Sequence, residues 1–317
     1  MSFNDYQLEQ DGLIICEPCL CITLFSNANA GEPDSPDMLG PYRAFMARFK
    51  DSVRYSVLDG NQSRAKQVKP SHFDDVYNKL AAFKRREISG PVAFFRNGKI
   101  TEEVRTPAFD QRLTRGGEKA QASVARISLS LSWFEKEGLP GINQLLDECL
   151  QGFVLRSGYV GYCFVYSGYR SYDRTAETYF SHWLLRHPGL MNPSLSQTIA
   201  SIFGLPDLGW ITLLGQEFVE KMGGEAVLRD AVKPIAQAHW RAYPNGVIGI
   251  RMGDAPRMGD LQGGDTMEDY KALGKVLAPL RDRDAIGKCM SVPGLIGPGF
   301  EQYAPMLPKW INRFFPE

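Results

Sequence analysis

The chain has 317 residues, of which 44% are hydrophobic and 23% are charged. These fractions are ordinary for a globular protein with a buried core, and the length exceeds the usual size of one domain. The 36 basic and 36 acidic side chains cancel, so the formal net charge is zero. This balance argues against a general binder of nucleic acid or membrane surfaces, because both classes normally carry a basic excess.

We expect no secretion signal at the start of the chain. Residues 1–5 are polar and acidic, without a basic start or a cleavable apolar stretch. The apolar run at 13–25 is interrupted by Glu17 and Pro18 and is too short to span a bilayer. Six cysteines in a chain of this kind indicate reduced thiols. We therefore expect a cytoplasmic protein with no membrane partner.

The first part of the chain is acidic. Its first 39 residues contain seven carboxylates and no Lys or Arg, and the loop at 27–37 carries Glu32, Asp34 and Asp37. One interpretation is a surface loop that caps the following helix at 38–49. The alternative is a contact surface for a basic partner.

The interval 43–126 is basic, with its densest point at 84–86. This triplet falls at the predicted C-terminus of a helix, where cations are favoured in any case. Further on, 92–95 reads as a strand that Asn97 and Gly98 turn into a second strand at 99–104. The segment 114–122 is the best linker candidate, so two lobes parting there is the alternative to a single unit.

The next elements show clear periodicity. In 123–134, apolar side chains alternate with Arg126, Ser128, Ser130 and Ser132, which predicts a strand with one solvated face in an antiparallel sheet. A helical stripe follows at 142–153, then a central strand at 158–168 and an amphipathic helix at 175–187.

The stretch 209–283 carries the strongest local signals. A short apolar strand at 210–214 leads into a helix, and Pro244-Asn245-Gly246 between two apolar runs predicts a tight hairpin. The loop 253–260 then precedes a helix for which Thr266 and Asp269 form an expected capping box.

These last motifs carry a resemblance to a known family. Gly-Trp-Ile-Thr-Leu-Leu-Gly at 209–215, Met-Gly-Gly at 222–224, Ile-Arg-Met-Gly-Asp-Ala-Pro-Arg-Met-Gly-Asp at 250–260 and Leu-Ala-Pro-Leu-Arg at 277–281 resemble the type VI secretion immunity family. More narrowly, the chain resembles the TsiV-type immunity proteins, which are paired with VRR-Nuc nuclease effectors. The motifs are apolar and rich in glycine, so they indicate a fold better than a site.

No catalytic constellation stands out. Cys16, Cys19 and Cys21 have no second ligand pair, and Cys19 and Cys21 share one face of a strand, which favours a core role over zinc. His182 and His187 are five residues apart on one helix and point in different directions. The sequence has neither a nucleophile elbow nor a phosphate loop. We expect no cofactor and no metal.

Candidate partner-binding residues come from two kinds of stretch. Tyr169, Arg170, Tyr172 and Asp173 follow the central strand, and Tyr and Arg often anchor interfaces. The resemblance implies a nuclease partner, and a nuclease that binds a phosphate backbone presents a basic cleft. Carboxylates on the inhibitor would complement this cleft. Besides the first loop, the later carboxylates are Asp254, Asp260, Asp265, Glu268 and Asp269. Turn formation and helix capping are the structural alternative for these later carboxylates.

The sequence thus predicts an α+β fold with a largely antiparallel sheet and packed amphipathic helices. The resemblance implies an immunity protein without enzymatic activity, whose partner is a cognate toxic effector with a VRR-Nuc type nuclease domain. By this interpretation it occludes the effector's active or DNA-binding site and touches no nucleic acid directly. The alternative is a small-molecule enzyme whose site is assembled from distant residues.

Overall fold

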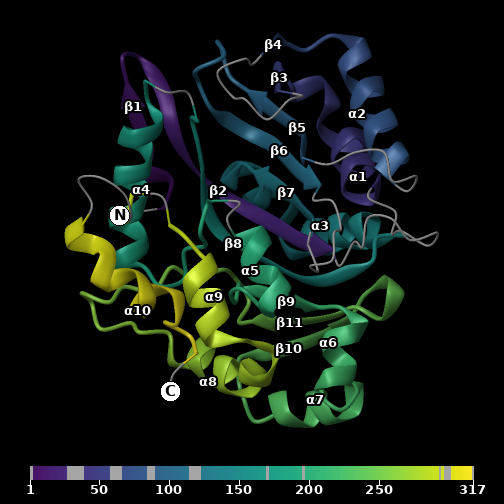
Figure 1. Cartoon of the computed structure of the whole chain (residues 1–317), viewed down its shortest axis with the longest axis vertical. Helices are drawn as coiled ribbons and strands as arrows, with labels where there is room; N and C mark the ends of the chain where they lie inside the picture. The colour runs from purple at the N-terminus through teal and green to yellow at the C-terminus, as the bar shows by residue number, and fades with distance from the viewer. Residues whose placement is uncertain are drawn as a thin grey trace.

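One antiparallel sheet runs through the molecule (Figure 1). The computed structural model describes residues 3–26, 39–57, 66–83, 90–113, 123–168, 171–194, 197–292, 294–295 and 301–315. Within them, eleven strands form the sheet in the order β10-β11-β9-β8-β2-β7-β6-β5-β3-β4, with β1 paired to β2. The strands are β1 Leu8–Gln10, β2 Leu13–Ser26, β3 Tyr55–Val57, β4 Lys66–Gln67, β5 Gly90–Asn97, β6 Arg105–Leu113, β7 Ser123–Leu129, β8 Leu155–Tyr166, β9 Ile211–Leu214, β10 Ala238–Ala242 and β11 Ile248–Met252. The predicted α+β class is confirmed.

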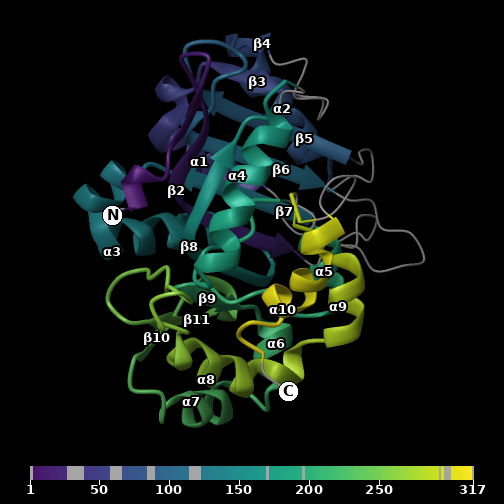
Figure 2. The same ribbon diagram turned by 90° about the vertical axis from the view of Figure 1, so that its left-hand side faces the viewer.

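Helices cover this sheet from several parts of the chain. They are α1 Leu39–Phe49, α2 Pro70–Phe83, α3 Leu131–Leu150, α4 Asp173–Arg186, α5 Gln197–Ala200, α6 Gln216–Lys221, α7 Glu225–Val232, α8 Glu268–Leu277, α9 Arg283–Cys289 and α10 Leu307–Ile311. Figure 1 shows β3 to β6 with α1 and α2 at the top, and β9 to β11 with α6 to α8 below. Figure 2 shows α4 lying lengthwise over the sheet beside β8.

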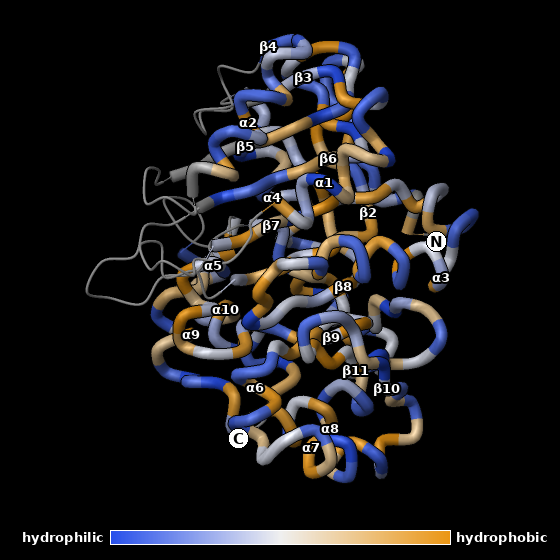
Figure 3. Tube along the Cα trace, turned by 90° about the vertical axis from the view of Figure 1, so that its right-hand side faces the viewer, coloured by the Kyte–Doolittle hydropathy of each residue, from blue (hydrophilic) through white to orange (hydrophobic). Residues whose placement is uncertain are grey.

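The central strand β2 separates two cores, because its side chains alternate between the two faces of the sheet. Leu20, Ile22 and Leu24 face a large core that α1, α3 and α4 cover. Cys19 and Cys21 face a second core with Cys163 and Met191. Figure 3 shows β2 as mainly hydrophobic and the edge strand β10 as mainly hydrophilic, which fits their places in the sheet. The predicted placement of Cys19 and Cys21 on one buried face is confirmed.

The polar face of β7 is buried, which corrects the expectation of a solvated face. Arg126 is 4% exposed and donates hydrogen bonds to the carbonyl oxygens of Asn192, Pro193 and Ser194. Its Nε also donates to Thr23 Oγ1 at 3.2 Å. The chain at 192–194 therefore lies over this face and accepts hydrogen bonds from its arginine. The antiparallel pairing of β7 with β2 and β6 agrees with the sequence-based prediction.

Three further local predictions are wrong. The strand expected at 123–134 ends at Leu129, because Ser130 is the N-cap of α3 and residues 131–134 are helical. Residues 98–102 form bends and turns, and the partner strand of β5 is β6, which begins at Arg105. The capping box at Thr266 does not form, because α8 begins at Glu268 after Met267, whose φ of 55° is left-handed. Met267 is 1% exposed, so burial of this side chain sets the entry to the helix in place of a polar cap. Residues 114–122 lie outside the described residues, and β6 pairs with β7 on either side of them.

Candidate partner-binding surface

The loop at 253–267, between β11 and α8 and here called the acidic loop, carries three of the six acidic candidates that the structure describes, and the first turn of α8 carries two more. Asp260 accepts hydrogen bonds from Arg186 at the end of α4, with nitrogen–oxygen distances of 3.0 and 2.7 Å. These bonds to the Arg186 guanidinium hold the pKa of the Asp260 carboxyl well below its usual range. The ion pair ties the loop to α4.

Arg257 pairs with two more carboxylates from within the same segment. Its guanidinium lies 3.0 and 3.1 Å from the two oxygens of Asp265 and 3.0 Å from Asp269. These ion pairs are local, so Asp265 and Asp269 give the loop its shape as well as its charge. The structural alternative for these two residues is helix capping, but the N-cap of α8 is Met267, whose side chain makes no capping hydrogen bond. Both carboxylates bind Arg257 instead.

Asp254 and Glu268 project furthest into solvent among the acidic candidates that the structure describes. The side chain of Asp254 is 95% exposed and lies 3.2 Å from Arg251. Glu268 is 75% exposed and lies 2.6 Å from Lys271. Exposed pairs of this kind contribute at most about 1 kcal/mol, so either carboxylate can exchange its partner for a cation of another protein.

Tyr172 and Asp173 lie at the opposite end of α4 from Arg186. A helix rises about 1.5 Å per residue, so about 20 Å separates them from the acidic loop. The Tyr172 hydroxyl donates to Asp11 Oδ2 at 3.4 Å. The structure thus places Tyr172 and Asp173 away from the loop rather than gathering all candidates at one point. Tyr169, Arg170, Glu32, Asp34 and Asp37 lie outside the described residues.

Glu177, one turn after Asp173, gives a test by pH. Burial, with the Asp173 charge as a second cause, raises the pKa of Glu177 from 4.5 to about 7. The folded state therefore holds this proton more tightly than the unfolded chain. The resulting stabilisation is complete below about pH 4.5 and is lost as pH rises through 7. Between pH 5 and 8 we expect the free energy of unfolding of the wild type to fall by about 1 kcal/mol relative to that of Glu177→Gln, after allowing for partial solvent exposure.

Urea denaturation of the wild type and Glu177→Gln at several pH values checks this expectation. Glu217→Gln, which changes a half-exposed carboxylate on α6, is the matched control and should follow the wild type. If the free energies of unfolding of the wild type and Glu177→Gln changed in parallel with pH, the assigned role of Glu177 would be wrong.

A groove that sequence reasoning missed lies where α4, the acidic loop and the C-terminal segment meet. Its cavity volume is about 540 Å³. The residues around it are His182, Leu184, Leu185, Arg186, Pro188, Leu261, Gln262, Thr266, Lys271, Tyr303, Met306, Lys309, Trp310 and Arg313. Leu261 and Met306 are 48% and 45% exposed, so the groove combines apolar and charged groups. The feature of the sequence that points to this groove is Leu261, an apolar residue within the otherwise polar and glycine-rich turn 259–264.

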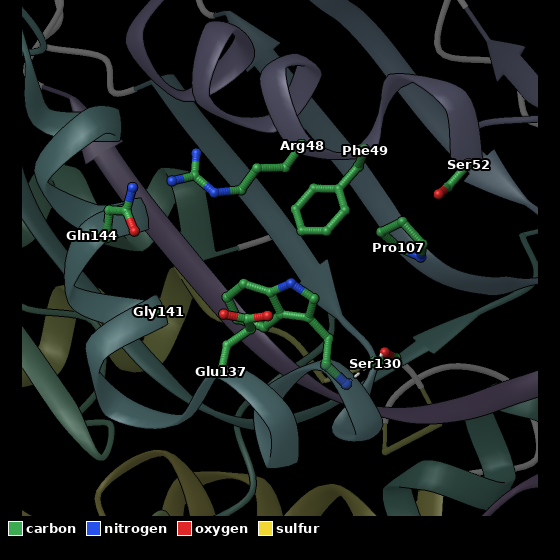
Figure 4. Close-up of a pocket in the computed structure, with 9 residues that line it drawn as sticks. Arg48, Phe49, Ser52, Pro107, Ser130, Glu137, Gly141 and Gln144 are labelled. Carbon is green, nitrogen blue, oxygen red and sulfur yellow. Dashed lines mark hydrogen bonds between the residues drawn. The ribbon is translucent and has the colours of Figure 1, made fainter.

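A second pocket, of about 500 Å³, lies between α1 and α3 (Figure 4). Its lining residues are Arg48, Phe49, Ser52, Pro107, Ser130, Trp133, Glu137, Gly141 and Gln144. Figure 4 shows Phe49 and Glu137 projecting from the two helices toward the same space. Sequence reasoning missed this pocket too, because its walls come from three separate parts of the chain.

His187 and the buried cysteines have packing roles. His187 is buried, with Nδ1 2.6 Å from the Gly259 carbonyl oxygen and Nε2 3.3 Å from the Tyr6 hydroxyl. Burial raises the pKa of the Cys19 and Cys163 thiols, which keeps them protonated. Among the residues that the structure describes, no group of three or more His, Cys, Asp and Glu side chains is arranged to hold a metal ion. None of the described helices has the length and apolarity needed to cross a membrane.

These features define an α+β protein whose candidate sites lie open on its surface. The chain belongs to the family described as type VI immunity for VRR-NUC, whose model matches residues 48–314. It is thus a type VI immunity protein, and its partner is a nuclease effector of the VRR-Nuc type. The resemblance seen in the motifs of 209–281 is confirmed.

A solved structure supports the same fold. The T6SS protein PA0821 of Pseudomonas aeruginosa is similar with a TM-score of 0.70 and 18% sequence identity, over 98% of this chain and 87% of that chain. None of the curated proteins compared with this chain matches it. At this level of identity the structural similarity concerns the fold alone.

Proposed function

We propose that this protein neutralises its nuclease effector by covering the surface with which the nuclease grips nucleic acid, and that it catalyses no reaction itself. Such a nuclease must present basic groups to a phosphate backbone, so acidic groups on the inhibitor complement it. The nuclease attacks nucleic acid inside the cell, and we place the action of the inhibitor in the cytoplasm.

The proposed contact face is the acidic loop with the adjoining groove. Leu261 and Met306 expose apolar surface in the groove. The outward carboxylate of Glu268, at the start of α8, binds Thr266 and Lys271, which both line this groove. An apolar centre with a charged rim is the usual arrangement of a protein interface. This juxtaposition is the observation on which the proposal rests. The other described candidates, Tyr172, Asp173, Asp254, Asp260, Asp265 and Asp269, remain predicted contacts of the same partner.

We also propose that the chain acts as a single unit. The strands β6 and β7, which precede and follow the segment 114–122, pair with each other in one sheet. The alternative is a division into two lobes at this segment. A rigid sheet of this extent would hold the contact face in a fixed shape, which lowers the entropic cost of binding.

The test combines binding with protection. The purified chain is titrated with a catalytically inactive form of the cognate nuclease, and cells expressing the active nuclease are grown with and without the chain. Leu261→Asp and Met306→Asp should each weaken binding by about 2 kcal/mol or more, because each places a charge in the centre of the interface.

Val154→Asp is the matched control, since Val154 is 51% exposed in the turn between α3 and β8. It should bind and protect as the wild type does. Equal binding by all three variants would exclude this face. Absence of protection by the wild type, together with turnover of a phosphate or other ester by the chain, would replace the proposal with an enzyme.

A further inference from the structure

The pocket between α1 and α3 has one carboxylate that is weakly paired. Glu137 is 38% exposed, and its Oε1 lies 3.0 Å from Lys136 Nζ, whose own side chain is 80% exposed. An ion pair this exposed is readily exchanged for a better-placed cation. Glu137 therefore offers negative charge at the mouth of the pocket.

The pocket's own cation is already engaged. Both terminal nitrogens of Arg48 donate to the two oxygens of Glu148, one of them at 2.5 Å, and Nη1 also lies 3.4 Å from the Ala44 carbonyl oxygen. Gln144 Nε2 adds a hydrogen bond to the same Glu148 carboxylate at 3.2 Å. The charge of Arg48 is thus compensated inside the fold. An anionic ligand would compete with Glu148 for this guanidinium, whereas a cation bound to Glu137 would leave the Arg48–Glu148 pair in place.

Aromatic side chains form the apolar part of the wall. The rings of Phe49 and Trp133 lie edge to face, with centroids 6.0 Å apart. Glycine is required at 141, because a Cβ there would lie 2.6 Å from Glu137 Cβ and 3.3 Å from Trp133 Cη2. Gly141 therefore allows the carboxylate and the indole to stand close together over the helix.

From this geometry we propose that the pocket receives an arginine side chain of the nuclease effector, an inference that depends on the proposed function. The guanidinium stacks on the Trp133 and Phe49 side of the pocket and donates to the Glu137 carboxylate. A planar, weakly hydrated cation suits a site with aromatic walls and one carboxylate better than a lysine ammonium does. Nucleases that bind a phosphate backbone expose arginines on the binding face.

Two features of the surroundings bear on this assignment. The N-terminus of α3 works against a cation, but its end charge is about half an elementary charge, and Glu135 and Glu137 lie within its first two turns. The helix α3, which forms one wall of the pocket, also packs close to the start of the acidic loop. Phe134 contacts Trp210 at 5.5 Å between ring centroids, and the Trp210 indole donates to the Gly253 carbonyl oxygen at 3.3 Å.

The test measures binding of the catalytically inactive cognate nuclease to the full chain by calorimetry. Glu137→Gln should weaken binding at least about tenfold, as expected for loss of one partner of a charged contact. Glu135→Gln removes the same charge from an exposed position two residues away and should bind within about twofold of the wild type. The thermal midpoint of Glu137→Gln should equal that of the wild type, since Glu137 is partly exposed.

Arginine-to-alanine variants of the nuclease identify the occupant. One of them should weaken binding to the wild type and cause no further loss with Glu137→Gln, because both changes remove the same contact. If the wild type does not bind the nuclease, the proposed function itself is overturned. If it binds and Glu137→Gln binds equally well, only the pocket assignment fails. If Glu137→Gln weakens binding but no nuclease arginine is coupled to it, the arginine assignment is wrong.

Discussion

Replacement of Asp207 by alanine is expected to lower the free energy of unfolding by about 3 to 5 kcal/mol, the usual loss when one member of a buried ion pair is removed. The Asp207 side chain is 1% exposed and accepts a hydrogen bond from Arg313 Nη2 at 2.9 Å. Arg313 is itself 9% exposed and donates to the carbonyl oxygens of Pro188 and Leu190. Without the carboxylate, a buried guanidinium would be left with carbonyl partners only.

Arg281 increases the expected loss. Burial lowers the pKa of Arg281 to about 10, and the nearby Asp207 carboxylate opposes that shift. The same arginine donates to the carbonyl oxygens of Leu205, Pro206 and Ile311, so it joins the segment before β9 to the C-terminal helix. Asp207 thus compensates two buried cations at the point where these segments meet.

Urea denaturation measures this effect. Asp147→Ala is the matched control, because Asp147 pairs with Arg241 at 2.7 Å while both side chains remain substantially exposed. The free energy of unfolding of Asp147→Ala should fall by less than about 1 kcal/mol. Equal losses for the two variants would show that Asp207 contributes no more than a surface pair.

The parts of the fold that the sequence predicts are those that local chemistry determines. Asn245 and Gly246 have φ angles of 60° and 69°, the left-handed values that a tight turn between two strands needs. The hairpin of β10 and β11 follows directly from these two residues. The sequence also predicts the central place of β8, because a strand with apolar or small residues on both faces has to be buried on both sides. In the structure β8 lies between β2 and β9.

The parts that the sequence does not predict depend on contacts between distant segments. Alternation in β7 marks a polar face correctly but cannot show that residues 192–194 cover it and accept hydrogen bonds from Arg126. The same limit applies to the candidate site. The acidic residues of the loop were visible, whereas their pairing with Arg186 and Arg257 depends on where α4 ends and how the loop bends.

Substitution of Gly274 by alanine is expected to destabilise the protein strongly although it lies in a helix. In an isolated helix this change stabilises by about 1 kcal/mol. Here α8 meets the end of the chain, and a Cβ at 274 would lie 1.6 Å from the Phe314 carbonyl oxygen. The C-terminal segment must then move away. Trp310, Ile311, Phe314 and Phe315 are each at most 4% exposed, and release of two such side chains costs about 3 to 6 kcal/mol.

Gly287 in α9 provides the matched control, because a Cβ there would meet no atom within 4 Å. Gly287→Ala should therefore leave the free energy of unfolding unchanged or raise it by up to about 1 kcal/mol. Urea denaturation of both variants compares the two effects, and proteolysis near the C-terminus should become faster in Gly274→Ala alone. If Gly274→Ala proved as stable as Gly287→Ala, close packing of the C-terminal segment against α8 would not be a source of stability.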